Sequence, residues 1–224
     1  GPTLIDNNLL LSKASLRLAT EGVACVHNLM LGSITSIGAN TDYPGEGKTE
    51  PRFTPYHIQH RTEVAGFMTI LHGDDRFYNN IFVQNWPVEP KGKESVVDRD
   101  PDDTEQVGTN GFDDYPTYDE WYAPFARLDG TYAKENDMNE LMSAHFGHLP
   151  VWAAGNMYFN GAKAWKKETD NLVNTKDKVD FELVEDGDKT TIKTNLFDLI
   201  GDYAEGIITT DTLGEAFEPE QRYE

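Results

Sequence analysis

The sequence predicts an all-β fold, a right-handed parallel β-helix that carries a helical and loop insertion and a small β-rich C-terminal appendage. Three observations lead to this prediction. A short unit, one asparagine followed by three apolar residues, recurs along the chain, and helical periodicity is sparse. Residues 179–196 alternate apolar and polar side chains on both sides of Asp186-Gly187, which is typical of a β-hairpin.

The repeated unit is the strongest of these signals. Its copies are Asn8–Leu11, Asn28–Leu31, Asn80–Val83 and Asn156–Phe159. The first two lie 20 residues apart, close to one turn of a solenoid, and the wider gaps of 52 and 76 residues would hold further rungs or insertions. At the bend between two strands of a β-helix, an asparagine amide can turn inward and hydrogen-bond the amide of the next rung. Alternatively, each asparagine marks an ordinary β-turn of a sandwich.

The positions of the repeats also predict the domain organisation. Residues 1–165 are expected to form rungs of the β-helix, with an insertion over about 85–149, and 166–224 to form the appendage. The insertion begins with an acidic, proline-containing stretch, which is typical of a surface excursion. Within it, 115–128 and 134–147 show helical spacing of apolar residues, and Asn136 or Asp137 can cap the second helix.

Composition excludes several classes of function. Nineteen basic and 39 acidic residues give a formal charge of −20, which repels phosphate backbones and anionic lipids, so no nucleic-acid or membrane partner is expected. No apolar run approaches the roughly 20 residues of a transmembrane helix. We expect a soluble bacterial protein, cytoplasmic or secreted. The single cysteine, Cys25, stands in an apolar segment and is expected to be a buried core residue.

A dense polar cluster begins in the segment TPYHIQHRTEVAG, residues 54–66. Tyr56 offers a stacking face, and the neutral imidazoles of His57 and His60 each offer one donor and one acceptor, which suits sugar hydroxyls. Two histidines three residues apart on non-helical backbone are weak evidence for zinc, so no metal is expected. The alternative is a hydrogen-bonded loop with a purely structural role.

Carboxylates and arginines complete this cluster. Glu63 either binds sugar hydroxyls or forms a strand-end ion pair with Arg61. Asp74 and Asp75 either line the same groove one rung later or, with Arg76, hold the turn before the next strand. The predicted substrate-binding residues are Tyr56, His57, His60, Glu63, Asp74 and Asp75.

Five segments, taken together and in order, resemble glycoside hydrolase family 120: GPTLIDNNLLLS, VHNLMLGSI, PYHIQHRTEVAG, GDDRFYNNIFV and GNMYFNGAK. They cover most of residues 1–165 in scattered blocks, and TTDTLGEA in the tail is loosely similar. The resemblance implies a right-handed β-helix β-xylosidase with a retaining mechanism, no cofactor, and a neutral xylo-oligosaccharide as substrate. It also implies that the catalytic Asp and Glu lie upstream of Gly1-Pro2, so we expect this chain to be part of the enzyme and inactive alone.

The residues themselves allow a second placement of the catalytic pair. A retaining mechanism needs two carboxyl groups about 5–5.5 Å apart. Rungs stack at about 4.8 Å, so Glu63 with Asp74 or Asp75 on neighbouring rungs could meet that separation. Glu63 and Asp75 are therefore fallback catalytic candidates.

Other features have weaker functional interpretations. The run Asp98–Asp103 could hold calcium but lacks the spacing of an EF-hand loop, so a solvated acidic loop is favoured. Trp86, Trp121, Tyr122 and Trp152 could stack on sugars or pack against the β-helix.

Two other functions stay open from the sequence. One is a non-catalytic carbohydrate-binding β-helix protein. The other is a polysaccharide lyase, although a chain of net charge −20 would repel a polyanionic substrate. An open end of a β-helix also exposes unpaired strand edges, which favours association into a homo-oligomer.

Overall fold

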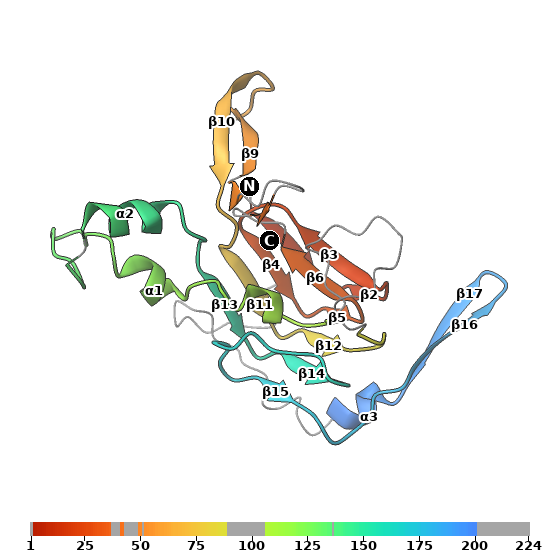
Figure 1. The fold of residues 1–224 in the computed structure, drawn as a ribbon. Coiled ribbons are helices and arrows are strands. Elements are labelled where there is room, and N and C mark those ends of the chain that lie inside the picture. Colours follow the sequence, from red (N-terminus) through yellow and green to blue (C-terminus); the bar gives the residue numbers. More distant parts are fainter. Residues whose placement is uncertain are drawn as a thin grey trace.

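A computed structural model describes residues 2–36, 41–42, 49–50, 52–88, 106–135 and 137–200. These residues are mostly β, with few and short helices. Strands from distant parts of the sequence lie side by side in parallel sheets (Figure 1). The predicted all-β class and parallel pairing agree with this arrangement.

The first sheet contains four parallel strands in the order β1-β4-β11-β13. They are β1 (Thr3–Asp6), β4 (Val23–Val26), β11 (Asp75–Tyr78) and β13 (Val151–Ala154). In one register row Ile5, Cys25, Phe77 and Ala153 are neighbours. Cys25, Phe77 and Ala153 are buried, so this row points into the core. The thiol of Cys25 has its pKa raised to about 12 by burial, and the prediction of a core cysteine is confirmed.

The second sheet repeats the same order one step further along the chain. Its parallel strands are β2 (Leu9–Leu10), β5 (Leu29–Met30), β12 (Ile81–Val83), β14 (Met157–Phe159) and β15 (Leu172–Val173). Two residues separate each of the first four from the preceding first-sheet strand. In the first two layers, β2 is followed by β3 (Ala14–Leu18) and β5 by β6 (Ser33–Ser36), and these two strands pair in parallel. Each asparagine unit is thus one layer of a stack.

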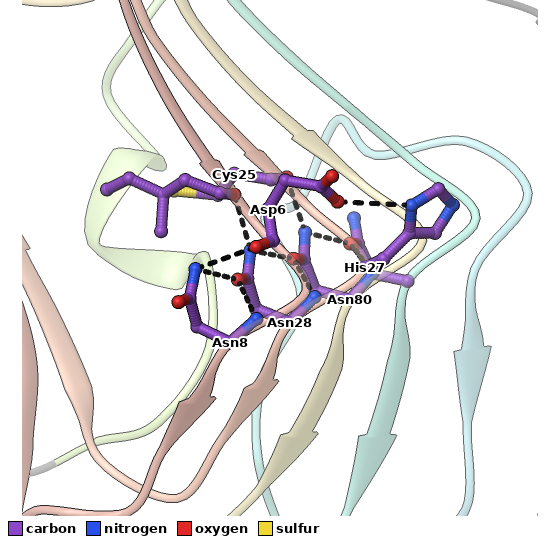
Figure 2. Close-up of polar contacts among 8 residues, drawn as sticks. Asp6, Asn8, Cys25, His27, Asn28 and Asn80 are labelled. Carbon is purple, nitrogen blue, oxygen red and sulfur yellow. Dashed lines mark hydrogen bonds and ion pairs between the residues drawn. The ribbon is translucent and has the colours of Figure 1, made fainter. Parts of the chain in front are cut away.

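The bends between the two sheets have a common backbone conformation. Asn7, His27 and Asn79 have φ of 55°, 54° and 53°, and Gly155 occupies the same place at 68°. Asparagine and glycine adopt this left-handed region at lower cost than other residues. His27 also lies 3.4 Å from a carboxylate oxygen of Asp6, measured from its Nδ1 atom (Figure 2). His27 is therefore a turn residue that contacts the layer before it.

The next residue in each layer belongs to an asparagine ladder, defined as Asn8, Asn28, Asn80 and Asn156. The Oδ1 atom of each later member accepts hydrogen bonds from the backbone N–H and the Nδ2 of the member before it, at 2.9–3.1 Å. Each Nδ2 also donates to a backbone carbonyl, as Asn80 does to Cys25 at 2.8 Å. Figure 2 shows Asn8, Asn28 and Asn80 in line. The predicted amide-to-amide bonding is confirmed.

The interior on either side of this ladder is apolar. Large buried rings fill it, including Phe77 against Phe112 at 4.9 Å and Phe82 stacked on Tyr158 at 5.0 Å between ring centroids. Such contacts add to the gain from apolar burial. Phe112 lies in a short 3-10 helix, Asn110–Phe112, so part of the predicted insertion contributes to the core.

Several excursions leave the stack (Figure 1). Three are antiparallel strand pairs, and the others are short helices. Their bounds are β7 (Thr41–Asp42) with β8 (Thr49–Glu50), β9 (Arg52–His57) with β10 (Val64–Ile70), α1 (Tyr118–Tyr122), α2 (Met138–His145), β16 (Phe181–Asp186) with β17 (Lys189–Thr194), and α3 (Leu196–Ile200). The predicted hairpin over 179–196 is present as β16 and β17.

The two predicted helices differ in outcome. The helix predicted over 115–128 is wrong in extent, because α1 spans five residues. Thr117 and Glu120 form a capping box at its start, and Pro124, which lacks an N–H, cannot continue the helical hydrogen bonds. The helix predicted over 134–147 is present as α2, and Asp137 caps it by accepting the Glu140 N–H at 2.8 Å.

Candidate functional site

One register row of outward-facing side chains on the first sheet consists of Leu4, Ala24, Arg76 and Trp152. The guanidinium of Arg76 lies 4.2 Å from the ring centroid of Trp152, in a cation–π contact. One guanidinium nitrogen of Arg76 also donates to Oδ1 and to the carbonyl oxygen of Asp74, each at 2.9 Å. An arginine held at two points presents its remaining donors in a defined direction.

Helix α1 extends this surface with aromatic rings. Tyr118 lies 6.3 Å from Trp152 and is stacked at an interplanar angle of 27°, and Tyr118 also stacks on Tyr122 at 5.7 Å. Trp121 contacts Phe125 at 5.4 Å. We define the aromatic surface as Arg76, Tyr118, Trp121, Tyr122 and Trp152. The side chain of Tyr118 is 46% exposed, whereas the other four are partly buried.

An ion pair holds α1 against the stack. The Nζ of Lys167 lies 2.6 Å from Oε2 of Glu120 and donates to the Tyr115 carbonyl at 2.9 Å. The hydrogen bond from Lys167 lowers the pKa of Glu120 below its ordinary value. The rings of α1 therefore have a fixed attachment beside Trp152.

The chemistry of the aromatic surface is that of recognition. Partly exposed aromatic rings offer flat apolar faces, while Arg76 and Asp74 offer charged donors and acceptors for hydroxyl groups. Arg76 and Trp152 each stand four residues before a ladder asparagine, Asn80 and Asn156. The repeat therefore carried a signal that these two side chains would be neighbours, and sequence reasoning missed it.

The predicted cluster of Tyr56, His57, His60 and Glu63 lies elsewhere, on the hairpin of β9 and β10. All four side chains are exposed. The hairpin projects away from the stack (Figure 1), and the seven residues of β10 separate its turn from the first sheet by roughly 20 Å. The structure thus brings these four residues together but does not bring them to Asp74 or Asp75.

Glu63 forms the ion pair that the sequence offered as its structural alternative. Arg61 contacts the two carboxylate oxygens of Glu63 at 2.7 and 3.1 Å. This hydrogen bonding from Arg61 is the main reason that the pKa of Glu63 is lowered. Since both side chains are more than half exposed, the pair orders the hairpin turn without adding much stability.

Asp74 and Asp75 are adjacent in sequence but have different surroundings. Asp74, at φ 54°, pairs with Arg76 beside the aromatic surface. Asp75 is 0% exposed and accepts the Val23 N–H at 3.0 Å through Oδ1. Burial raises the pKa of Asp75 to about 7. The two fallback catalytic candidates therefore lie in different surroundings: Glu63 is exposed on the hairpin, and Asp75 is buried in the interior.

A second, partly buried carboxyl, Glu168, was missed by sequence reasoning. Its Oε1 accepts from Nδ2 of Asn156 at 2.7 Å, and its Oε2 accepts from the Tyr158 hydroxyl at 2.5 Å. Thr109 lies within hydrogen-bonding distance of both Tyr158 and Glu168. Burial raises the pKa of Glu168 to about 7. Glu168 takes the place of a fifth amide and ends the ladder.

A shortened asparagine unit, Asn171 followed by two apolar residues, was also missed. Asn171 precedes β15, which pairs with β14, but its side chain is exposed, and Glu168 occupies the ladder position instead. The spacing from Asn156 is 15 residues, shorter than one turn of the predicted solenoid. The sequence signal was therefore present but fell outside the expected period.

An open polar groove of about 690 Å³ lies on another part of the stack, between Gln84, Asn160 and the segment 174–181. The amide of Asn160 bonds both backbone groups of Val179, at 2.8 and 2.9 Å. Asn174 accepts from the backbone N–H groups of Lys176 and Asp177 through Oδ1. The side chains of Asn160 and Asn174 therefore hydrogen-bond the backbone of residues 176–179.

The remaining sequence hypotheses concern metals and membranes. The run Asp98–Asp103 lies outside the described residues. Within the part of the chain that the structure describes, no group of three or more His, Cys, Asp or Glu side chains could hold a metal ion. Among the same residues, no helix combines the length and apolar character needed to cross a membrane.

Comparison with known proteins adds one structural relative. No protein-family model matches the chain, and no curated protein matches it. A solved structure, the complex of XylC with xylose, is similar with a TM-score of 0.59 and 29% sequence identity. The match covers 97% of this chain and 30% of that chain. The chain thus shares its fold with part of a protein that was solved with xylose bound.

Proposed function

We propose that this chain is part of a retaining glycoside hydrolase that resembles β-xylosidases and releases xylose from xylo-oligosaccharides. We further propose that its layers are rungs of a right-handed parallel β-helix, that residues 1–165 and 166–224 are its two parts, and that the catalytic Asp and Glu lie outside these 224 residues. The observation that carries the proposal is the match over 97% of the chain to the complex of XylC with xylose.

The asparagine ladder supports the fold in this proposal. Bonds between Asn8, Asn28, Asn80 and Asn156 join successive layers through the same atoms. A parallel β-helix brings equivalent positions of successive rungs to about 4.8 Å, a spacing suited to a row of residues along a bound oligosaccharide.

The aromatic surface is the proposed sugar-contacting part of the chain. Trp152 and Tyr118 would stack on the apolar face of a pyranose ring, while Asp74 and Arg76 would bond to its hydroxyls. A neutral sugar suits a chain of formal charge −20 better than a uronate polymer does. Tyr56, His57, His60, Glu63 and Asp75 stay proposed substrate-binding residues, and their substitution forms a separate test.

The first experiment compares hydrolysis of an aryl β-xyloside by this chain and by a longer parent protein that contains it. Activity of the parent together with an inactive chain is the expected result. Activity of the chain alone would contradict the upstream placement and make Glu63, Asp74 and Asp75 the next residues to substitute.

The second experiment tests the aromatic surface in the parent enzyme. Trp152→Ala removes the ring on which Arg76 and Tyr118 pack, and we expect KM for xylo-oligosaccharides to rise roughly three- to tenfold, the scale of one aromatic contact. Trp86→Ala is the matched control, because Trp86 is 39% exposed and lies outside the aromatic surface. Equal KM values for both variants would remove the aromatic surface from the proposal.

A carbohydrate-binding protein without chemistry is the second candidate. The observation in its favour is the aromatic surface, which suits binding and contains no buried acid of its own. Titration of the parent with xylobiose, followed by tryptophan fluorescence, separates the two candidates. Saturable binding without release of xylose would support this second function and contradict the first.

A further inference from the structure

A short turn connects the end of the asparagine ladder to the aromatic surface. We define the connecting turn as residues 165–168, in which the Glu168 N–H donates to the Trp165 carbonyl at 3.0 Å. Its last two side chains are adjacent in sequence but have different partners. Lys167 bonds to α1, whereas Glu168 bonds to Asn156, the last member of the ladder. A displacement of Glu168 therefore also displaces Lys167, because a single peptide bond joins them.

Lys167 holds the first turn of α1 through one atom of Glu120. Oε2 of Glu120 accepts from the Nζ of Lys167 at 2.6 Å and from the Thr117 N–H at 2.8 Å. The same Nζ donates to the carbonyl of Tyr115, shortly before α1, at 2.9 Å. Trp121 of the aromatic surface follows directly after Glu120 on α1. The position of Lys167 therefore influences where the rings of α1 lie.

On the other side of the turn, Glu168 faces neutral groups. Its Oε1 accepts from Asn156 at 2.7 Å, its Oε2 accepts from the Tyr158 hydroxyl at 2.5 Å, and Thr109 lies 3.3 Å away. Among these three neighbours only Tyr158 titrates. Burial and the nearby Glu168 raise the pKa of Tyr158 well above 10, so the phenol keeps its proton in neutral solution.

The two lysines of the connecting turn do not neutralise Glu168. The Nζ of Lys166 lies 3.9 Å from Asp114, and the Nζ of Lys167 pairs with Glu120. Within the part of the chain that the structure describes, no cationic side chain forms an ion pair with Glu168. Loss of the Glu168 proton thus leaves a charge in a partly buried position without a cation, and burial raises the pKa of Glu168 to about 7.

Solvent is within reach of Glu168, because the next two residues, Thr169 and Asp170, are exposed. An ionised Glu168 gains hydration by turning towards this side. That movement breaks the hydrogen bond to Tyr158 and rotates the peptide that joins Glu168 to Lys167. The ammonium group of Lys167 then leaves its place on α1.

We propose that the connecting turn is a pH-sensitive link between the ladder and the aromatic surface: protonated Glu168 keeps Lys167 on α1, and ionised Glu168 draws the turn away and shifts the rings. The aromatic surface is then ordered in mildly acidic solution and loosened above neutral pH. The inference rests on the proposed function only for what this surface binds. Its test contains no sugar, so its failure is distinguishable from failure of the proposed function.

The test follows the tryptophan rings of the 224-residue chain, labelled with 5-fluorotryptophan, by fluorine NMR across pH 5–8, on either side of about 7. Substitution of each of the four tryptophans by phenylalanine assigns the resonances. We expect the resonance of Trp121, on α1, to shift in one step with a midpoint near pH 7. The resonance of Trp86, which lies outside the aromatic surface, should stay constant.

Three variants test the route of this effect. Glu168→Gln keeps polar groups for the same partners but does not titrate, so the step in the Trp121 resonance should disappear. Lys167→Met removes the cation that holds α1, so the step should disappear at Trp121, while Trp165 within the turn still reports the titration of Glu168. Lys166→Met is the matched control, because Lys166 lies on the same turn but near a different carboxylate, and it should keep the step.

Three results would overturn the proposal. One is a Trp121 resonance that stays constant from pH 5 to pH 8 in the unchanged chain. Another is a step that persists in Glu168→Gln, which would point to the other carboxyl whose pKa is about 7, Asp75. The third is a step that persists in Lys167→Met, which would mean that Glu168 does not act through this lysine. Separate resonances for the four tryptophans show that each variant is folded.

Discussion

The side chain of Asn80 bonds to the layers before and after its own. It accepts from the backbone N–H and Nδ2 of Asn28 and donates to Cys25 and Asn156, all while 0% exposed. Asn80→Ala leaves these buried groups without partners. We expect a loss of about 3–5 kcal/mol in the free energy of unfolding, measured by urea denaturation.

Asn8→Ala is the control for that substitution. Asn8 stands at the end of the ladder with an exposed side chain, so water can replace its bonds. We expect a loss of about 1 kcal/mol. Equal losses at both positions would show that burial along the ladder does not determine the contribution of each amide.

Glu168 predicts a dependence of stability on pH. Burial raises its pKa from 4.5 to about 7, so the folded chain binds a proton that the unfolded chain releases between those values. The contribution to stability is therefore full below about pH 4.5 and is lost as the pH rises through about 7. Asp75, whose pKa is also raised to about 7, contributes in the same direction.

Glu168→Gln should reduce this dependence. The amide keeps an acceptor for Asn156 and a polar group for Tyr158, as a fifth ladder amide would, and it does not titrate. We expect the loss of stability between pH 5 and pH 8 to shrink by roughly 3 kcal/mol at most, with the part due to Asp75 remaining. An unchanged pH profile in the variant would mean that Glu168 is not the titrating group.

At the scale of elements, the contact between successive layers depends on glycine at one bend. A Cβ added to Gly32, which separates β5 from β6, would lie 2.1 Å from the carbonyl oxygen of Ser12 in the layer before. Gly32→Ala therefore forces the backbones apart, and we expect a loss of roughly 2–3 kcal/mol. Gly66→Ala in β10 is the control, because nothing lies within 4 Å of its added Cβ. Thermal unfolding of both variants measures the difference.

The elements that the sequence predicted are those whose signal is local. The asparagine units predicted the second-sheet strands because each layer needs the same amide at the same bend. The β9–β10 hairpin was not predicted, since Pro55 and Gly66 interrupt the alternation that marks a strand. Helix α1 was overestimated because apolar spacing does not account for Pro124.

The candidate site was less predictable because it depends on which layers become neighbours. Arg76 and Trp152 lie 76 residues apart and meet only because β11 pairs with β13. The polar segment 54–66 attracted attention for its density of functional groups, yet the excursion that carries it leads away from the first sheet. The role of Glu168 depends on contacts with Thr109, Asn156 and Tyr158 that no local pattern indicates.

For the whole molecule, the net negative charge opposes association between copies of the chain. The chain has a formal charge of −20 at pH 7 and an isoelectric point near 4.5. Lowering the pH towards that value removes the mutual repulsion, and we expect a minimum of solubility near pH 4.5. Light scattering across pH 4–8 measures it. Clear solutions at every pH would contradict this prediction and show that surface charge does not keep the chains apart.

The ladder has a consequence for how such a chain can change over evolution. Its asparagines are separated by 20, 52 and 76 residues, yet the backbone N–H to Oδ1 distances between them are 3.0, 3.0 and 2.9 Å. The length of the intervening segment is therefore independent of how the layers stack. Segments can be gained, lost or exchanged between units without shifting the strands, and a foreign recognition loop could be grafted between Asn28 and Asn80 on the same principle.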